Sequence, residues 1–205
     1  MNLGATATLP IAAERGVWYH AVPPQHFATA LHTFVKENRF NPGSIIASPF
    51  EILYLAENPL VAQFEVEALF GSPLTPGGVV ANPAKPWAIV NIDVSLTAVV
   101  DLTSVNECQR LLETTAQELT GDWRGYSQRN NPSAKIKEPT GLAPTQMLGR
   151  MLYEGGRCEG FRTISAKLPY YEVLAIFPHR LLPGSLVQYK YTDTSDQLHQ
   201  VTLVP

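Results

Sequence analysis

The sequence predicts an α+β fold in which a mixed or antiparallel sheet forms the core and helices surround it. Three observations lead to this prediction. Strand patterns occur near both ends of the chain, helical patterns with capping signals fill the middle, and strands do not alternate regularly with helices. The third observation disfavours a doubly wound nucleotide-binding fold. Neither GxGxxG nor GxxxxGK[ST] occurs, which removes the usual phosphate-loop interpretations.

The first half of the chain supplies three strand candidates. Residues 1–15 are interpreted as an N-terminal arm, followed by a single domain over residues 16–205. Residues 16–22 and 52–56 are short apolar runs of the kind that form strands. Residues 87–96, WAIVNIDVSL, alternate between apolar and polar side chains, which indicates a strand with one face buried.

The second half begins with helices and ends with strands. Residues 104–121, SVNECQRLLETTAQELTG, form the clearest helical pattern. Ser104 and Glu107 fit a capping box, and Gly121 fits a C-terminal stop. A second helix is predicted over residues 143–156. The remaining strand candidates are residues 160–165, 172–177, 185–192 and 198–204.

Composition excludes several classes of function. The 205 residues carry a net charge of -3 without a Lys/Arg run, so a basic surface that binds nucleic acid is not expected. No apolar stretch reaches roughly 18 residues, so no membrane span is expected. The N-terminus lacks the pattern of a secretory signal. Cys108 and Cys158 are too few for a disulfide framework, so we expect reduced thiols in a cytoplasmic protein. The sequence is also compatible with a homo-oligomer.

The histidines do not show the spacing of metal ligands, and no metal site is expected.

A more informative stretch is ILYLAENPLVAQFE, residues 52–65. Asn58 is a suitable N-cap and Pro59 a suitable first helical residue, and Gly71 is a plausible stop. Glu65 falls at the edge of the apolar arc of this helix. Because an unpaired buried carboxylate is costly, Glu65 needs either a partner, such as a nearby arginine, or a function.

Two upstream residues favour the functional interpretation of Glu65. Arg39 lies in NRFNPG, a loop rich in turn-forming residues, and such loops often carry binding groups. Tyr54 lies in the strand that leads into the helix of Glu65. Taken separately, Arg39 is an ordinary surface charge and Tyr54 an ordinary core aromatic. Taken together, they place a cation, an aromatic ring and an acid in order along a strand–turn–helix unit.

Four segments of the chain carry a resemblance to a known family. They are WYHAVPP, NRFNPGS, ILYLAENPLVAQFEVEALFG and EGFRTISA, and the resemblance runs from about Val17 to Phe177. The chain resembles the RES domain, which is named for an Arg, a Glu and a Ser. The resemblance implies a fold similar to that of ADP-ribosyltransferase toxins. It also implies a bacterial toxin that consumes NAD, with a helix-turn-helix antitoxin of the Xre type as its partner.

The resemblance also assigns roles to residues of this chain. Cleavage of the nicotinamide–ribose bond of NAD passes through an oxocarbenium-like ribose, which a carboxylate such as Glu65 can stabilise. Arg39 suits the pyrophosphate, and Tyr54 can stack on the charged nicotinamide ring. Ser165 can donate a hydrogen bond to a phosphate or to the nicotinamide amide. The predicted catalytic residues are Glu65 and Arg39, and the predicted substrate contacts are Tyr54, Ser165, Tyr19 and His20.

The chain departs from the family pattern at one position. RES domains often carry an arginine after the aromatic residue of the first strand, where this chain reads Trp18-Tyr19-His20. A histidine is charged only part of the time near neutral pH and cannot grip a phosphate with two parallel hydrogen bonds. Two alternatives to an NAD glycohydrolase or phosphorylase stay open, and this departure is the reason for the second of them. One is an ADP-ribosyltransferase that modifies a protein, and the other is an inactive RES-like binding module.

Overall fold

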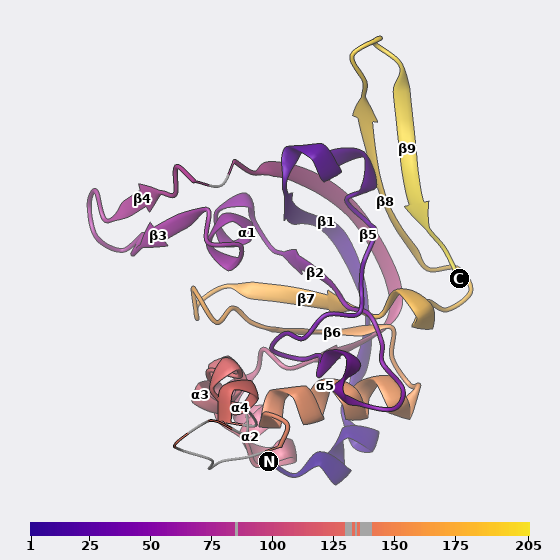
Figure 1. Cartoon of the computed structure of the whole chain (residues 1–205). Helices are drawn as coiled ribbons and strands as arrows, with labels where there is room; N and C mark the ends of the chain where they lie inside the picture. The colour runs from indigo at the N-terminus through magenta and orange to yellow at the C-terminus, as the bar shows by residue number, and fades with distance from the viewer. Residues whose placement is uncertain (85, 130–132, 134, 136–140) are drawn as a thin grey trace.

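The computed structural model describes residues 1–84, 86–129, 133, 135 and 141–205, and it confirms the predicted α+β class. Seven strands form one sheet in the order β1-β2-β7-β6-β5-β8-β9, and β3 and β4 form a separate two-stranded sheet (Figure 1). The strands are β1 (Ile11–Val22), β2 (Leu53–Ala56), β3 (Leu69–Gly71), β4 (Val79–Ala81), β5 (Ala88–Asp101), β6 (Gly160–Ile164), β7 (Glu172–Ile176), β8 (Leu186–Thr192) and β9 (Leu198–Leu203).

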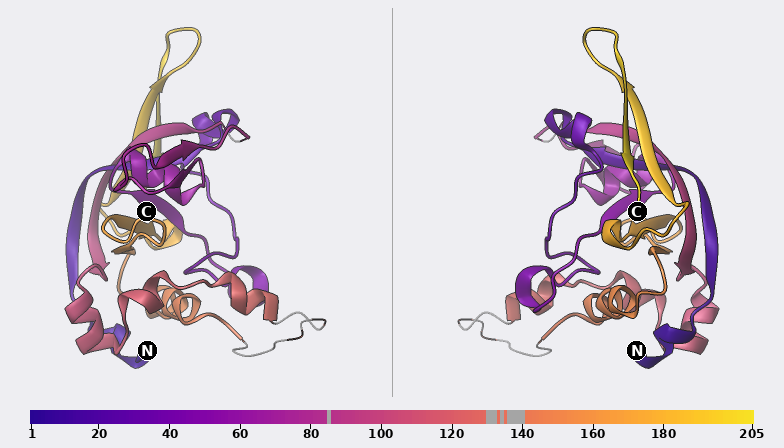
Figure 2. Two further views of the ribbon diagram at one scale, coloured as in Figure 1. Left: turned by 90° about the vertical axis from the view of Figure 1, so that its left-hand side faces the viewer. Right: turned by 90° about the vertical axis from the view of Figure 1, so that its right-hand side faces the viewer.

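The main sheet is strongly curved, because β1 pairs both with β2 and with β5. The long β1–β5 ladder runs from the Ile11–Val100 pair to the Val22–Ala88 pair. The β5–β6 pairing is parallel, and the other pairings of the sheet are antiparallel. The β8–β9 hairpin leaves the middle of β5 and projects beyond the rest of the molecule (Figure 2).

The α-helices gather mostly at one end of the sheet, where α2, α3, α4 and α5 lie together (Figure 1). Their bounds are α1 (Pro59–Glu65), α2 (Val105–Leu112), α3 (Ala116–Thr120), α4 (Arg124–Arg129) and α5 (Pro144–Gly155). The described residues also form the 3-10 helices η1 (Leu3–Thr8), η2 (Pro24–Thr29), η3 (Gly43–Ile45) and η4 (Pro178–Arg180). Within the described residues, no helix has the length and apolar character needed to span a membrane.

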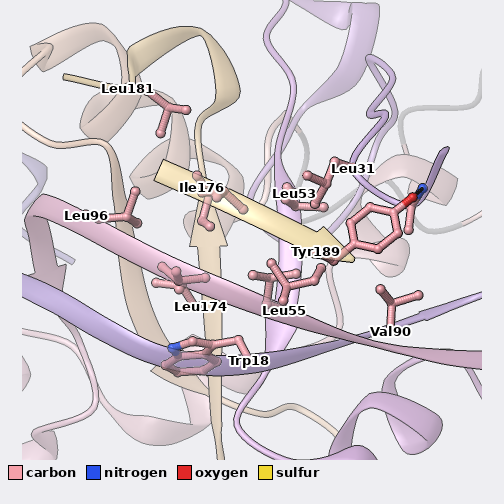
Figure 3. Packing of buried hydrophobic residues seen from close by; sticks show 14 of the residues in the cluster. Trp18, Leu31, Leu53, Leu55, Val90, Leu96, Leu174, Ile176, Leu181 and Tyr189 are labelled. Atoms are coloured by element: carbon pink, nitrogen blue, oxygen red, sulfur yellow. Dashed lines mark hydrogen bonds between the residues drawn. The ribbon is translucent and has the colours of Figure 1, made fainter. Parts of the chain in front are cut away.

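Each face of the main sheet packs against a buried apolar cluster, and alternate residues of each strand face opposite sides. On one face, Trp18, Leu55 and Leu174 belong to a cluster that also includes Tyr189 of β8 (Figure 3). On the other face, Phe161 packs in a cluster with α2, α3 and α5. A third cluster surrounds α1. Each fully buried large apolar side chain contributes about 1.5–3 kcal/mol, so this burial holds the strands in a fixed register.

The helix predicted over residues 104–121 is two helices in the structure. Glu113 adopts a left-handed conformation with φ of 50°, which ends α2 after Leu112. Thr115 and Glu118 then form a reciprocal capping box that starts α3. The predicted cap at Ser104 is present, since its side chain accepts a hydrogen bond from the backbone of Glu107. The prediction failed because the second start signal lies inside a continuous helical pattern.

The helix of Glu65 also ends earlier than predicted. It stops at Glu65, and the left-handed Glu67, with φ of 62°, turns the chain into β3. Gly71 is therefore the end of a strand and not a helix stop. A Cβ at Gly71 would lie 1.8 Å from the carbonyl oxygen of Gly78, so the tight β3–β4 hairpin requires glycine there.

The first residues are ordered against the domain and do not form a free arm. Leu3–Thr8 form η1, the Asn2 N–H donates to the carbonyl of Leu112 at 2.6 Å, and Leu9 is buried. The first strand begins at Ile11, five residues before the predicted strand. Residues 12–15 read Ala-Ala-Glu-Arg and are mostly exposed, so this part of the strand lacks the apolar pattern that would predict it.

Candidate functional site

Arg39 lies in the tight turn that the NRFNPG segment predicts. The side chain of Asn41 holds this turn, because its Nδ2 donates to the carbonyl of Phe50 and its Oδ1 accepts from the N–H of Gly43. Arg39 is only 7% exposed. Its Nη2 donates to the carbonyl oxygen of Ile164 at 3.2 Å, at the end of β6. Its Nη1 is buried and has no hydrogen-bond partner among the described residues.

Helix α5 packs closely against this turn. A Cβ added to Gly149 would lie 2.0 Å from the carbonyl oxygen of Phe40, so only glycine allows the helix to approach so near. The Phe40 ring packs edge-on against Phe161 of β6, with ring centroids 4.9 Å apart. Arg39 is therefore fixed by a helix and a strand that lie more than 100 residues later in the sequence.

Tyr54 reaches the same region from β2. Its hydroxyl donates to Oδ1 of Asn38 at 2.5 Å. Burial raises the pKa of Tyr54 well above its usual range, although the positive charge of Arg39 and the N–H of Phe40 oppose this effect. The Tyr54 hydroxyl is therefore protonated near neutral pH.

Glu65 is the last residue of α1, and the structure explains its position. Asn58 caps the helix, since its side chain accepts from the N–H of Val61 at 3.0 Å, an interaction worth about 1 kcal/mol. Val61 and Phe64 are buried against the sheet, which leaves Glu65 partly exposed at the edge of this contact. Glu65 does have a partner: the Ser165 hydroxyl donates to its Oε1 at 2.5 Å.

The hydrogen-bonding capacity of Ser165 is fully used in this arrangement. Its oxygen accepts from the backbone N–H groups of Lys167, at 3.2 Å, and Leu168, at 3.0 Å. A serine hydroxyl has one hydrogen and two lone pairs, so the hydrogen goes to Glu65. Ser165 is also completely buried. It orients one oxygen of Glu65 in this structure and leaves the other oxygen of the carboxylate without a bond from this hydroxyl.

The four strongest predicted residues thus come together. Burial lowers the pKa of Arg39, whereas the charge of Glu65 and the hydroxyl of Tyr54 raise it. Arg39 binds the carbonyl of Ile164, the residue that precedes Ser165, and Ser165 binds Glu65. These residues come from the NRFNPG loop, from β2, from α1 and from the end of β6. Together they bring a guanidinium, two hydroxyls and a carboxylate into one region, where each affects the charge of its neighbours.

Tyr19 and His20 have different surroundings. Tyr19 pairs with Ala56 and packs in the cluster around α1, on the face of the sheet that carries Tyr54. By strand alternation His20 lies on the other face, with Trp18. Burial lowers the pKa of His20 to about 4, and a hydrogen bond with the Tyr54 backbone opposes this effect only in part. The His20 ring is therefore neutral at pH 7.

Sequence reasoning missed Asn38, the residue directly before Arg39, although it binds the hydroxyl of Tyr54. The only sequence signal was its place in a turn-rich loop, where Asn commonly bonds to nearby backbone. Among the residues that the structure describes, no three His, Cys, Asp or Glu side chains are grouped so that they could hold a metal ion. Cys108 and Cys158 are both free and buried, and burial raises the pKa of each thiol to about 11.

Comparison with known proteins finds similarity among solved structures. No protein-family model matches the sequence, and no curated protein is significantly similar to it. A chain in the crystal structure of the M. tuberculosis MbcT–MbcA toxin–antitoxin complex has a similar fold, with a TM-score of 0.59 and 16% sequence identity. The match covers 99% of this chain and 92% of that chain. The α+β architecture is thus one that occurs in a toxin–antitoxin complex.

Proposed function

We propose that this chain is the toxin of a toxin–antitoxin pair and that it cleaves the nicotinamide–ribose bond of NAD. The observation that carries the proposal is the pairing of Glu65, oriented by Ser165, with the buried and incompletely bonded Arg39. The RES-like order of Arg39, Tyr54 and Glu65 supports it. The shared fold of a chain from a toxin–antitoxin complex supports the toxin role. The ADP-ribosyltransferase-like architecture belongs to the proposal and rests on the resemblance to RES domains.

The chemistry needs few catalytic groups. When the bond between the ribose C1′ and the pyridinium nitrogen breaks, the nitrogen keeps the bonding electrons and nicotinamide leaves as a neutral ring. The leaving group therefore needs no general acid. The ribose develops positive charge, which a fixed carboxylate stabilises. In this proposal the Glu65 oxygen not bonded to Ser165 faces the ribose and orients the attacking water, whose proton is released to solvent as ADP-ribose forms.

Arg39 supplies the binding energy for the negative part of the substrate. A guanidinium with a free N–H in a buried setting binds a phosphate strongly, because charged hydrogen bonds are strengthened where water is excluded. Tyr54 offers its ring to the nicotinamide, with Tyr19 on the same face of the sheet. His20 is buried and neutral, so in this proposal it supports the Tyr54 backbone and does not act as a second cation for the pyrophosphate.

The partner in this proposal is an antitoxin, and the RES-like order of residues favours the helix-turn-helix Xre type. The neighbouring reading frame tests that partner: we expect a small helix-turn-helix protein to be encoded beside this chain. Co-expression of the two should restore the growth that expression of this chain alone prevents.

Incubation of purified protein with NAD, followed by chromatography, tests the enzymatic part. We expect NAD to be lost and nicotinamide to appear in equal amounts. NAD labelled in its ADP-ribose part separates the acceptors, because water gives free ADP-ribose and phosphate gives its phosphorylated form. Label that stays on a polypeptide would instead support an ADP-ribosyltransferase. An unchanged NAD pool would support an inactive RES-like binding module.

A further inference from the structure

Asn38 connects two parts of the candidate site that belong to different elements. Its Oδ1 accepts from the Tyr54 hydroxyl at 2.5 Å and from the N–H of Phe40 at 3.1 Å. Its Nδ2 donates to the carbonyl of Lys36 at 3.3 Å. One amide side chain thus contacts β2 through Tyr54 and spans the backbone on both sides of Arg39.

The orientation of this amide follows from its backbone partners. A backbone N–H can only donate and a backbone carbonyl can only accept, so the atom facing Phe40 is the oxygen and the atom facing Lys36 is the nitrogen. Since an amide oxygen only accepts, the Tyr54 hydroxyl must donate its single hydrogen to Asn38. The Tyr54 oxygen then keeps only its lone pairs, and its orientation is set by Asn38.

Helix α5 fixes the backbone of Asn38 from the other side. The side chain of Gln146 is 1% exposed, and its Nε2 donates to the carbonyl of Asn38 at 3.2 Å. Its Oε1 accepts from the N–H of Ala143 at 3.0 Å at the start of the helix. The N–H of Asn38 also donates to the carbonyl of Asn41 at 2.9 Å, which closes the turn around Arg39.

We propose that Asn38 is a positioning residue that couples Tyr54 to Arg39. It holds the tyrosine hydroxyl in one orientation and holds the arginine turn at a fixed distance from it, with Gln146 anchoring the unit to α5. Asn38 does not itself need to touch the substrate. This inference rests on the proposed function for its kinetic consequence, but the Asn38–Tyr54 hydrogen bond is a property of the protein alone.

A double-mutant cycle on NAD turnover tests the coupling. Asn38→Ala removes the acceptor, and loss of one positioned hydrogen bond should lower kcat/KM about tenfold. Asn38→Asp keeps an oxygen for both Tyr54 and Phe40, and it should recover activity to within about threefold of the parent by the same reasoning. In the Asn38→Ala background, Tyr54→Phe should have almost no further effect. Asn106→Ala, on the exposed surface of α2, is the matched control and should behave as the parent.

A second readout does not depend on activity. Tyrosine labelled with ¹³C at Cζ reports the hydrogen bond of each hydroxyl by NMR, and the Tyr54 signal is the one that disappears in Tyr54→Phe. We expect this signal to shift in Asn38→Ala, to return in Asn38→Asp and to stay in place in Asn106→Ala. Thermal unfolding of each variant confirms that the comparison is between folded proteins.

The outcomes separate the two proposals. Suppose that the parent protein degrades NAD. If the losses in kcat/KM of Asn38→Ala and Tyr54→Phe multiply in the double variant, the coupling is overturned. If the double variant loses no more than Asn38→Ala alone, and Asn38→Asp recovers activity, the coupling is supported. If the parent protein does not degrade NAD, the proposed function fails, and the NMR signal decides alone. An unchanged chemical shift of Tyr54 in Asn38→Ala would then overturn the positioning role.

Discussion

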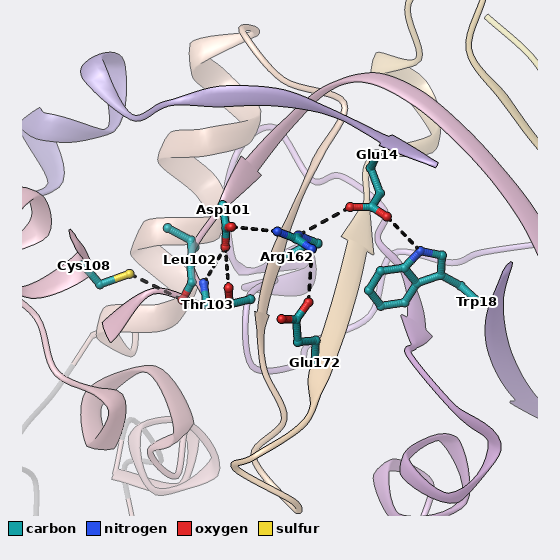
Figure 4. A network of polar contacts seen from close by, with 8 residues as sticks. All are labelled: Glu14, Trp18, Asp101, Leu102, Thr103, Cys108, Arg162 and Glu172. Atoms are coloured by element: carbon teal, nitrogen blue, oxygen red, sulfur yellow. Dashed lines mark hydrogen bonds and ion pairs between the residues drawn. The ribbon is translucent and has the colours of Figure 1, made fainter. Parts of the chain in front are cut away.

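Two arginines near β6 show how differently a guanidinium can be used in one sheet. Arg162 lies on the face of the sheet that carries Leu174, where it forms ion pairs with Asp101 at 2.7 Å, Glu172 at 3.3 Å and Glu14 at 3.4 Å (Figure 4). Arg39 lies with Tyr54, beside the other face. Its only protein hydrogen bond among the described residues is to a carbonyl, and one of its nitrogens is buried without a partner.

The pKa shifts of the two arginines follow from these surroundings. Burial lowers the pKa of Arg39, and the neighbouring groups do not restore it. Burial also acts to lower the pKa of Arg162, but the attraction of Asp101, Glu172 and Glu14 outweighs it and raises the pKa overall. An arginine surrounded by carboxylates holds strands together. In the proposed function, the unused N–H of the buried Arg39 is the group that binds the anionic part of the substrate.

The largest expected effect is that of Glu65→Ala on the Arg39 side of the sheet. Removing a preorganised charge contact of this kind costs on the order of 10²–10³ in rate. Release of nicotinamide by the variant, measured under single-turnover conditions, should fall by that factor while the fold is kept. A variant that releases nicotinamide at the parent rate would remove Glu65 from the mechanism.

The next effect concerns pH and belongs to the Arg162 side, where His20 lies. His20 has a pKa of about 4 in the folded protein against 6.5 as its ordinary value. Between these values the unfolded chain binds a proton that the folded chain does not, so stability is complete above about pH 6.5 and declines as the pH falls toward 4. The decline should amount to about 2–3 kcal/mol in the free energy of unfolding.

Urea unfolding at a series of pH values measures this dependence. His20→Gln cannot take up the proton and should show a flatter profile between pH 6.5 and 4. The same steep decline in parent and variant would mean that other groups cause the acid sensitivity. At pH 7, where His20 is neutral, the two proteins should degrade NAD at similar rates if His20 only supports the Tyr54 backbone.

Arg39→Gln tests the anion-binding side of the comparison. Loss of a charged hydrogen bond is worth about 1.5–3 kcal/mol, so the KM for NAD should rise roughly tenfold to a hundredfold. Stability should change little or improve, because the substitution removes a buried charge that lacks a full set of partners. A variant with normal KM and a much lower melting temperature would instead make Arg39 a structural residue like Arg162.

Arg162→Gln makes the same substitution at the other arginine, and we expect the smallest effect from it, a loss of stability. It leaves the carboxylates of Glu14, Asp101 and Glu172 without their shared cation, and since the group is partly exposed the cost should be about 1–2 kcal/mol. The denaturant midpoint should fall while the KM for NAD stays at the parent value. A rise in KM comparable to that of Arg39→Gln would end the distinction between the two arginines.

The parts of this site that sequence could predict are those with local signals. Asn58 and Pro59 mark the start of α1, and apolar spacing places Glu65 at the edge of its buried face. The Asn-Pro-Gly turn signal identifies Arg39 as a candidate in the same way, because it places this residue in a loop. The assignment of Ser165 to the same site as Glu65 came from the resemblance to RES domains, because no local pattern connects residues that are 100 positions apart.

The parts that sequence could not predict depend on tertiary contacts. Gly149 is a glycine because the Phe40 carbonyl lies against α5, and nothing within the helix itself indicates this contact. The Arg162 cluster joins side chains from four strands, so its charges cannot be matched before the sheet order is known. The β3–β4 hairpin was missed because a glycine after a helix was taken as its stop.

The central claim is that the Arg39 side of the sheet cleaves NAD, and one measurement tests it most directly. Micromolar purified protein is incubated with NAD in parallel with Glu65→Ala and Arg162→Gln, and nicotinamide is quantified over time. We predict steady release by the parent protein and by Arg162→Gln, with release by Glu65→Ala lower by a factor on the order of 10²–10³. Equal release by all three proteins, or no release by the parent protein, would contradict the account.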